Sequence, residues 1–165
     1  MISVRPVLTA EEEQTLAALA HTIWHEYFPA IIGEAQTAYM VEKFQSLPAI
    51  RTQMKNGYRY FLLCVGGVPV GYTGVHAEED GRLFLSKLYV KKEFRGCGLS
   101  SAAIAYLKEL CKAENLSAIW LTVNRHNAHT IDVYRHFGFE TVREQVADIG
   151  NGYVMDDYVM ELTLS

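Results

Sequence analysis

The residues with the clearest chemical potential form a glycine-containing loop at residues 95–100, which follows an apolar segment that ends at Val90. Glycine permits the backbone angles and the close approach that let successive N–H groups point at one anion. Apolar residues at helical spacing follow the loop, and the dipole of a helix there adds positive potential at its N-terminus. Lys91, Lys92 and Arg95 supply further positive charge. The loop is therefore a candidate pyrophosphate site.

Two other phosphate-binding designs fit these glycines poorly. A nucleoside-triphosphate P-loop requires Lys and then Ser or Thr after the second glycine, where this chain has Leu99 and Ser100. A dinucleotide-binding turn has its glycines directly at the strand end, whereas five residues separate Val90 from Gly96. That design also requires an acidic residue at the end of the next strand, which here ends at Asn124. A plain glycine turn with a solvated basic face stays open as an alternative.

A third phosphate-loop design fits better. Residues 95–100 resemble the Gln/Arg-x-x-Gly-x-Gly/Ala acyl-CoA loop of the GNAT N-acetyltransferase superfamily, with Ser100 in the last small position. Residues 127–139 are similar to the family's Asn-x-x-Ala-x-x-x-Tyr-x-x-x-Gly-Phe segment, with Thr130 in place of alanine. The two blocks occur in the family's order and separation, and the resemblance extends over essentially the whole chain.

This resemblance implies an N-acetyltransferase that moves the acetyl group of acetyl-CoA to a primary amine by direct attack in a ternary complex. The amine must be neutral to attack, although an alkylamine has a pKa of about 10.4. The carbonyl oxygen becomes negative and needs fixed donors, and the leaving thiolate gains from a proton. Tyr134 occupies the family's tyrosine position and is the expected proton donor.

The resemblance also implies a set of residues that bind acetyl-CoA. Their backbone is expected to pair with the pantetheine arm at residues 88–90 and to hold the pyrophosphate at residues 95–100. Asn127 is expected to bond the pantetheine or to cap the following helix, and Cys97 is disfavoured as a nucleophile because no His or acidic partner lies at motif spacing. The predicted cofactor-binding residues are Leu88, Tyr89, Val90, Arg95, Gly96, Cys97, Gly98, Leu99, Ser100 and Asn127.

The acceptor side is less well defined. Glu26, Tyr27 and Glu34 are candidate substrate residues, because family acceptor sites lie between the first helices and the central strands. Residues 23–28 and 155–160 resemble the bacterial branch that contains polyamine acetyltransferases. A protein or peptide amine and a non-catalytic acyl-CoA sensor remain alternatives. The candidates for a general base are Glu26, Glu34, Glu78, Asp156 and Asp157.

The elements that must position these residues follow from the hydrophobic pattern. Ile2, Val4 and Pro6 alternate with polar or basic residues and predict a short first strand. Thr9 and Glu12 have the spacing of a capping box and predict a helix to about Tyr27. A second helix is expected to carry Tyr39, Met40, Phe44 and Leu47, and a third covers residues 48–56. Beyond them the pattern predicts strands at 60–65, 68–75 and 82–90, a helix at 99–114, a strand at 119–123, a helix at 128–136, and strands at 139–149 and 153–164.

This order predicts an α+β fold with a mixed, mostly antiparallel central sheet of about seven strands flanked by helices, the GNAT fold. A strand–helix–strand crossover is expected over residues 90–119. One GNAT acetyltransferase domain is expected over residues 1–165. Since the family often dimerises, the C-terminal strand is a candidate contact for a homodimer.

Composition narrows the partners and the compartment. The chain of 165 residues has 15 Lys+Arg against 19 Asp+Glu, a formal net charge of −4, which argues against a nucleic-acid partner and suits a cationic one. Its three cysteines form no CxxC pair, which predicts free thiols and a cytoplasmic location. The apolar stretches are too short for a membrane span, and no secretory leader is recognised. His21 and His25 lie one helical turn apart without a zincin glutamate, so no metal site is expected.

Overall fold

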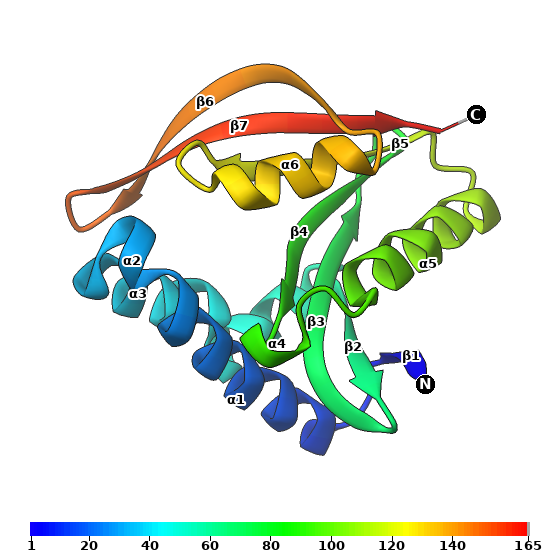
Figure 1. The fold of residues 1–165 in the computed structure, drawn as a ribbon, viewed down its shortest axis with the longest axis horizontal. Helices are drawn as coiled ribbons and strands as arrows, with labels where there is room; N and C mark the ends of the chain where they lie inside the picture. The colour runs from blue at the N-terminus through cyan, green and yellow to red at the C-terminus, as the bar shows by residue number, and fades with distance from the viewer. Residues whose placement is uncertain (165) are drawn as a thin grey trace.

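The computed structural model describes residues 1–164, and a seven-stranded mixed sheet forms its centre with helices packed on both faces (Figure 1). The predicted α+β architecture is confirmed. The elements are β1 (Ile2–Pro6), α1 (Ala10–Tyr27), α2 (Pro29–Ile32), α3 (Glu34–Met40), the π-helical turn η1 (Val41–Gln45), α4 (Leu47–Lys55), β2 (Arg59–Val65), β3 (Val68–Ala77), β4 (Arg82–Val90), the 3₁₀ turn η2 (Lys92–Phe94), α5 (Leu99–Ala113), β5 (Ala118–Asn124), α6 (Ala128–His136), β6 (Glu140–Gly150) and β7 (Tyr153–Thr163).

The sheet opens in its middle. Its strand order is β1-β2-β3-β4-β5-β7-β6, and β4 and β5 form the parallel pair that α5 connects, as the sequence pattern predicts. These two strands pair only where Arg82–Phe84 meets Ala118–Trp120. Residues 85–90 of β4 have no partner on β5, so the two strands diverge along the rest of their length (Figure 1).

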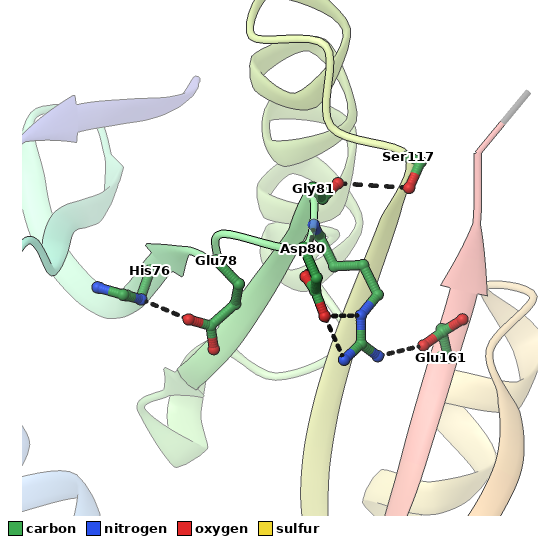
Figure 2. Close-up of polar contacts among 7 residues, drawn as sticks. His76, Glu78, Asp80, Gly81, Ser117 and Glu161 are labelled. Atoms are coloured by element: carbon green, nitrogen blue, oxygen red, sulfur yellow. Dashed lines mark hydrogen bonds and ion pairs between the residues drawn. The ribbon is translucent and has the colours of Figure 1, made fainter.

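Polar contacts hold β4 and β5 together at the end of the sheet where the two strands are paired (Figure 2). The Ser117 hydroxyl donates to the carbonyl of Gly81 at 3.3 Å (Figure 2), and the backbone N–H of Ser117 donates to the same carbonyl at 2.8 Å, which ties the start of β5 to the start of β4. The Nη1 of Arg82 donates to Glu161 on β7 at 2.7 Å, while its Nε donates to Asp80 at 2.9 Å. The two halves of the sheet are therefore joined at the end where β4 begins, and they are open at the end where β4 finishes.

A β-bulge interrupts β4 beside the opening. Gly74 of β3 pairs with Lys87 and Val75 pairs with Leu85, so Ser86 is an extra residue without a counterpart. The bulge resets the alternation of side chains between the two faces of the strand. Such an inserted residue leaves no trace in the hydrophobic pattern, which predicts a plain strand here.

Two main cores lie on opposite faces of the sheet. Leu83, Leu107 and Ile119 belong to the core beneath α5 and α6. Leu16 and Ile50 belong to the core beneath α1 and α4. Each helix buries its apolar stripe against one face, and the opening between β4 and β5 lies between the two layers.

The second predicted helix differs from the observed chain. The sequence pattern predicts one helix that reaches Leu47, but α3 ends at Met40, residues 41–45 form a π-helical turn, and Leu47 begins α4. Ser46 separates the two segments, because its backbone is extended and its hydroxyl accepts from the N–H of Ala49 at 3.3 Å. Ser46 is therefore the N-cap of α4, and its extended backbone ends the preceding helical segment.

The capping box of α1 is confirmed and allows a stability prediction. The Thr9 hydroxyl accepts from the N–H of Glu12 at 3.1 Å, and the Glu12 carboxylate accepts from the N–H of Thr9 at 3.0 Å. Thr9→Ala removes the side-chain acceptor, so we expect the free energy of unfolding to fall by about 1 kcal/mol. Chemical denaturation measures this change. The exposed Thr22 lies within the same helix, and Thr22→Ala is the matched control that should not destabilise; an equal loss in both variants would contradict the cap.

Candidate active site

The divergence of β4 from β5 creates a cavity of about 660 Å³. Its walls come from the end of α1, from β4 and the loop after it, from β5, from α6 and from β7. The structure thus brings the two sequence motifs together in one space. The predicted site residues that line the cavity are Tyr27, Leu88, Tyr89, Val90, Arg95, Gly96, Gly98, Leu99, Ser100, Asn127 and Tyr134.

The glycine loop lies at the mouth of α5. Gly96 and Gly98 have φ angles of +77° and +87°, in the left-handed region that favours glycine. Gly98 is the N-cap residue of α5, and no side chain within residues 1–164 caps that helix, so its first N–H groups are available to a ligand. Cys97, which the sequence places among the cofactor-binding residues, is exposed and does not line the cavity. The loop has the geometry of an anion site.

The edge of β4 offers a second binding element. Residues 85–90 pair with β3 on one side, whereas the side toward β5 has no strand partner in residues 1–164. The Val90 carbonyl accepts from the Nε of Arg95 at 3.4 Å. The other backbone N–H and C=O groups on that side can bond an extended ligand as though it were another strand. Leu88, Tyr89 and Val90 all lie on this stretch and line the cavity.

Tyr134 extends from α6 and is 7% exposed. Its ring packs edge-on against Phe139 with 5.3 Å between centroids, and no group within residues 1–164 hydrogen-bonds to its hydroxyl. Burial raises the pKa of Tyr134 well above its usual range, so the hydroxyl is protonated at neutral pH. A buried, protonated and unpartnered hydroxyl on the wall of a cavity is suited to donate a proton to a bound group.

Tyr27 connects three elements around the cavity. Its hydroxyl donates to the Oδ1 of Asn127 at 2.5 Å, and the Arg95 guanidinium lies over its ring at 4.5 Å from the centroid. Asn127 is the N-cap residue of α6, but its side chain makes no capping bond because it accepts from Tyr27 instead. The bond joins the end of α1 to the start of α6 beside the glycine loop.

Two of the acidic candidates lie outside the main cavity. Glu26 is exposed, and its carboxylate accepts from the N–H of Lys92 at 2.9 Å. Glu26 and His129 both line a neighbouring hollow of about 480 Å³. Glu34 is exposed at the start of α3 and lines neither space. Glu26 and Glu34, which the resemblance suggests, therefore do not line the cavity that Tyr134 lines.

Two further candidates are held by polar contacts elsewhere. Glu78 lies 2.9 Å from the Nδ1 of His76, near the closed end of the sheet (Figure 2). Asp156 accepts from the Nε of Arg125 at 2.8 Å and does not line the cavity.

Asp157 differs from these carboxylates. It lines the cavity, is 3% exposed, and lies opposite Asn124 of β5 in the sheet. Burial, together with the neighbouring charge of Asp156, raises the pKa of Asp157 to about 6. Of the five acidic candidates, it alone lines the cavity.

Sequence reasoning missed the aromatic wall of the cavity. Trp24 stacks on Phe28 with 4.0 Å between ring centroids and meets Tyr89 at 5.3 Å. The indole Nε1 of Trp24 donates to the hydroxyl of Tyr72 at 3.1 Å, and that hydroxyl donates to Gln45 at 2.8 Å. The spacing of four residues between Trp24 and Phe28, at the end of a predicted helix, is the signal that both share one face.

Lys87 is a buried cation behind this wall. Its Nζ donates to the carbonyl of Phe44 and to the hydroxyl of Tyr60, both at 2.5 Å, and to Gln53 at 3.0 Å. Burial lowers the pKa of Lys87 to about 7. These bonds tie η1 and α4 to the residue that follows the β4 bulge.

A sheet that opens beside a glycine loop, with a tyrosine on the facing helix, defines the class of GNAT-fold proteins. The sequence profile of the Acetyltransferase (GNAT) family matches residues 16–139 of this chain. The chain therefore belongs to the GNAT family of acetyltransferases, as its motifs predict.

Solved structures agree in fold over the whole chain. PaiA N-acetyltransferase from Thermoplasma acidophilum in complex with coenzyme A superposes with a TM-score of 0.80 at 18% identity, covering 99% of both chains. The ribosomal-protein-S18-alanine N-acetyltransferase from Escherichia coli superposes with a TM-score of 0.72 at 18% identity, covering 100% of this chain and 95% of that one. At such identities the likeness concerns the fold.

Curated relatives match over shorter segments. Spermine/spermidine N(1)-acetyltransferase of Bacillus subtilis (strain 168) is 32% identical over 66 residues, which are 38% of this chain and 41% of that protein. Thialysine N-epsilon-acetyltransferase of Bos taurus is 28% identical over 81 residues, which are 49% of this chain and 48% of that protein. The chain thus matches less than half the length of each of these relatives.

Proposed function

We propose that this protein is an acetyl-CoA-dependent N-acetyltransferase that transfers the acetyl group directly to a primary amine. The observation that carries the proposal is that the glycine loop, the free edge of β4 and the unpartnered hydroxyl of Tyr134 all line one cavity. Membership of the GNAT family supports the same reaction class.

In the proposed complex the cofactor spans the opening of the sheet. The pyrophosphate binds the N–H groups of residues 96–100 at the start of α5, where the helix dipole stabilises its charge. The pantetheine arm pairs with residues 88–90 in the place that a neighbouring strand would occupy. Both binding elements use backbone groups, which is consistent with a site that depends on glycines and on an open strand edge.

The chemistry follows from these positions. The lone pair of the neutral amine forms the N–C bond while negative charge develops on the thioester oxygen, which a backbone N–H of β4 stabilises. The C–S bond then breaks, and sulfur takes the proton of the Tyr134 hydroxyl. Tyr134 regains a proton from the nitrogen as the amide forms. The exposed Cys97 takes no part, because its side chain does not line the cavity.

The proposed acceptor is a small primary amine. The curated relatives are named as acetyltransferases of spermine, spermidine and thialysine, and each of these compounds carries a primary amine. An acyl-CoA sensor would use the same loop without turnover, but it has no need of an unpartnered hydroxyl beside the thioester.

The proposed setting is the cytoplasm. Cys64, Cys97 and Cys111 are free thiols, which suits a reducing compartment. Among the helices of residues 1–164, none combines the length and the apolar character that crossing a bilayer requires. The sequence suggests the C-terminal strand as the contact for a homodimer, but β7 is paired with β5 and β6 on its two sides. The proposed contact is instead the exposed edge strand β6.

The release of free thiol from acetyl-CoA tests the proposed function. We expect release above background when purified protein is incubated with acetyl-CoA and spermidine, and a panel of diamines, amino acids and peptides ranks the acceptors. Mass spectrometry checks that the product amine has gained one acetyl group. Tight binding of acetyl-CoA without turnover of any amine would instead favour the sensor.

A further inference from the structure

Asp157 has no partner of its own, although it is almost fully buried. It is 3% exposed on β7, and its strand neighbours are Asn124 of β5 and Gln145 of β6, both uncharged. Within residues 1–164, no hydrogen bond or ion pair reaches its carboxylate. Burial of most of the residue disfavours the carboxylate anion, so Asp157 gains from a cationic partner at the cavity surface onto which it opens.

A ligand bound in the cavity can reach Asp157 and supply the cationic partner that residues 1–164 do not provide. Among the described residues that line the cavity, Asp157 is the one carboxylate. The other titratable groups on its walls are Tyr27 of α1, Tyr89 of β4, Arg95 of the loop, and His129, Tyr134 and His136 of α6. On its own strand, Asp156 is held by Arg125 and does not line the cavity.

The aromatic wall lies in the same cavity and suits the same ligand. Trp24, Phe28 and Tyr89 form a contiguous cluster of rings that lines the space, and aromatic faces attract alkylammonium groups. Burial raises the pKa of Tyr89 well above its usual range, and Tyr134 and Asp157 raise it further. All three residues line the cavity, so the carboxylate and the phenol open onto the same space.

We propose that Asp157 is the catalytic residue on the acceptor side, where its carboxylate binds the ammonium group of the amine and takes its first proton. This inference rests on the proposed function. The ammonium loses one proton to Asp157, which passes it to water, and the neutral amine then attacks the thioester. Sulfur takes the proton of Tyr134, and Tyr134 takes the second proton of the nitrogen. The products are an amide, a thiol and one released proton, so atoms and charges balance.

The test compares Asp157→Asn with the wild type, using spermidine as the amine. We expect kcat/KM for spermidine at pH 7 to fall about 100-fold or more, as for the loss of a general base, while the Kd for acetyl-CoA changes less than threefold. In the wild type, kcat/KM should rise with pH through a limb near pH 6, because the carboxylate must be ionised. In the variant this limb should be absent, and activity should recover toward pH 10 as free neutral amine accumulates.

Controls separate this role from a structural one. Glu144→Gln removes a carboxylate from the adjacent strand β6 and is expected to keep the wild-type rate and pH profile, because Glu144 is exposed and pairs with Arg125. The melting temperature of Asp157→Asn should not fall, since the change removes an unpaired buried charge and keeps the shape. A variant with the wild-type rate and the limb near pH 6 would overturn the inference while leaving the acetyltransferase intact. A wild type without turnover of any amine would overturn the proposed function and, with it, this role.

Discussion

Gly98→Val is expected to abolish the binding of acetyl-CoA at concentrations that saturate the wild type. Gly98 has a φ of +87°, a conformation that costs an L-residue about 1–2 kcal/mol, and a β-branched side chain at least as much. A shift of the loop to relieve this strain withdraws the N–H groups that face the pyrophosphate, each worth about 1.5–3 kcal/mol as a bond to a charged group. Together these losses correspond to a Kd raised at least about 100-fold, which isothermal titration calorimetry measures.

A matched variant isolates the loop from general backbone strain. Gly67 has a φ of +82° with nothing within 4 Å of an added Cβ, and it lies in the turn between β2 and β3, outside the cavity. Gly67→Val should therefore lose stability in the same way but bind acetyl-CoA with the wild-type Kd. Normal binding by Gly98→Val would show that the pyrophosphate binds elsewhere.

Tyr134→Phe is expected to lower kcat at neutral pH by about 10²–10⁴-fold while the Kd for acetyl-CoA stays nearly unchanged. Phenylalanine keeps the ring that packs on Phe139, so the change removes the hydroxyl and little else. Without that proton the thiolate leaves unaided, and the loss falls on kcat because the interaction forms in the transition state. Steady-state kinetics with saturating amine, together with a binding titration, separates the two quantities.

Tyr106→Phe is the control for loss of a tyrosine hydroxyl. Tyr106 lies on α5, packs edge-on against Phe61 at 5.1 Å between centroids, and does not line the cavity. We expect this variant to keep the wild-type kcat. Equal rates for Tyr134→Phe and the wild type would exclude Tyr134 as the proton donor.

Most of the fold was predictable because its signals are local. The capping box at Thr9 and the switch from helical to alternating periodicity after Gly57 locate the strands and helices to within a few residues. The π-helical turn at residues 41–45 and the bulge at Ser86 were not predictable. Both depend on tertiary contacts, such as the bonds from Lys87 to the carbonyl of Phe44 and to Tyr60, and no local pattern encodes them.

The two sides of the site also differ in how far the sequence alone predicts them. The side that lies against the glycine loop could be predicted because a contiguous motif, with Gly96 and Gly98, carries its geometry. The proposed acceptor side is assembled from α1, β5 and β7, whose relative placement comes from packing alone. Asp156 and Asp157 look alike in the sequence, yet strand alternation places one on the cavity and the other against Arg125.

The short junction between β4 and β5 leaves the width of the cavity dependent on a few paired positions. The two strands share paired positions only at Arg82–Phe84 and Ala118–Trp120, and within residues 1–164 the six further residues of β4 have β3 as their only neighbouring strand. These six residues span about 20 Å, so a tilt of about 5° between the two halves of the sheet would move the far end of β4 by about 2 Å. A small change of angle at the junction, where Arg82 bonds Glu161, would therefore change the width of the cavity beside the glycine loop.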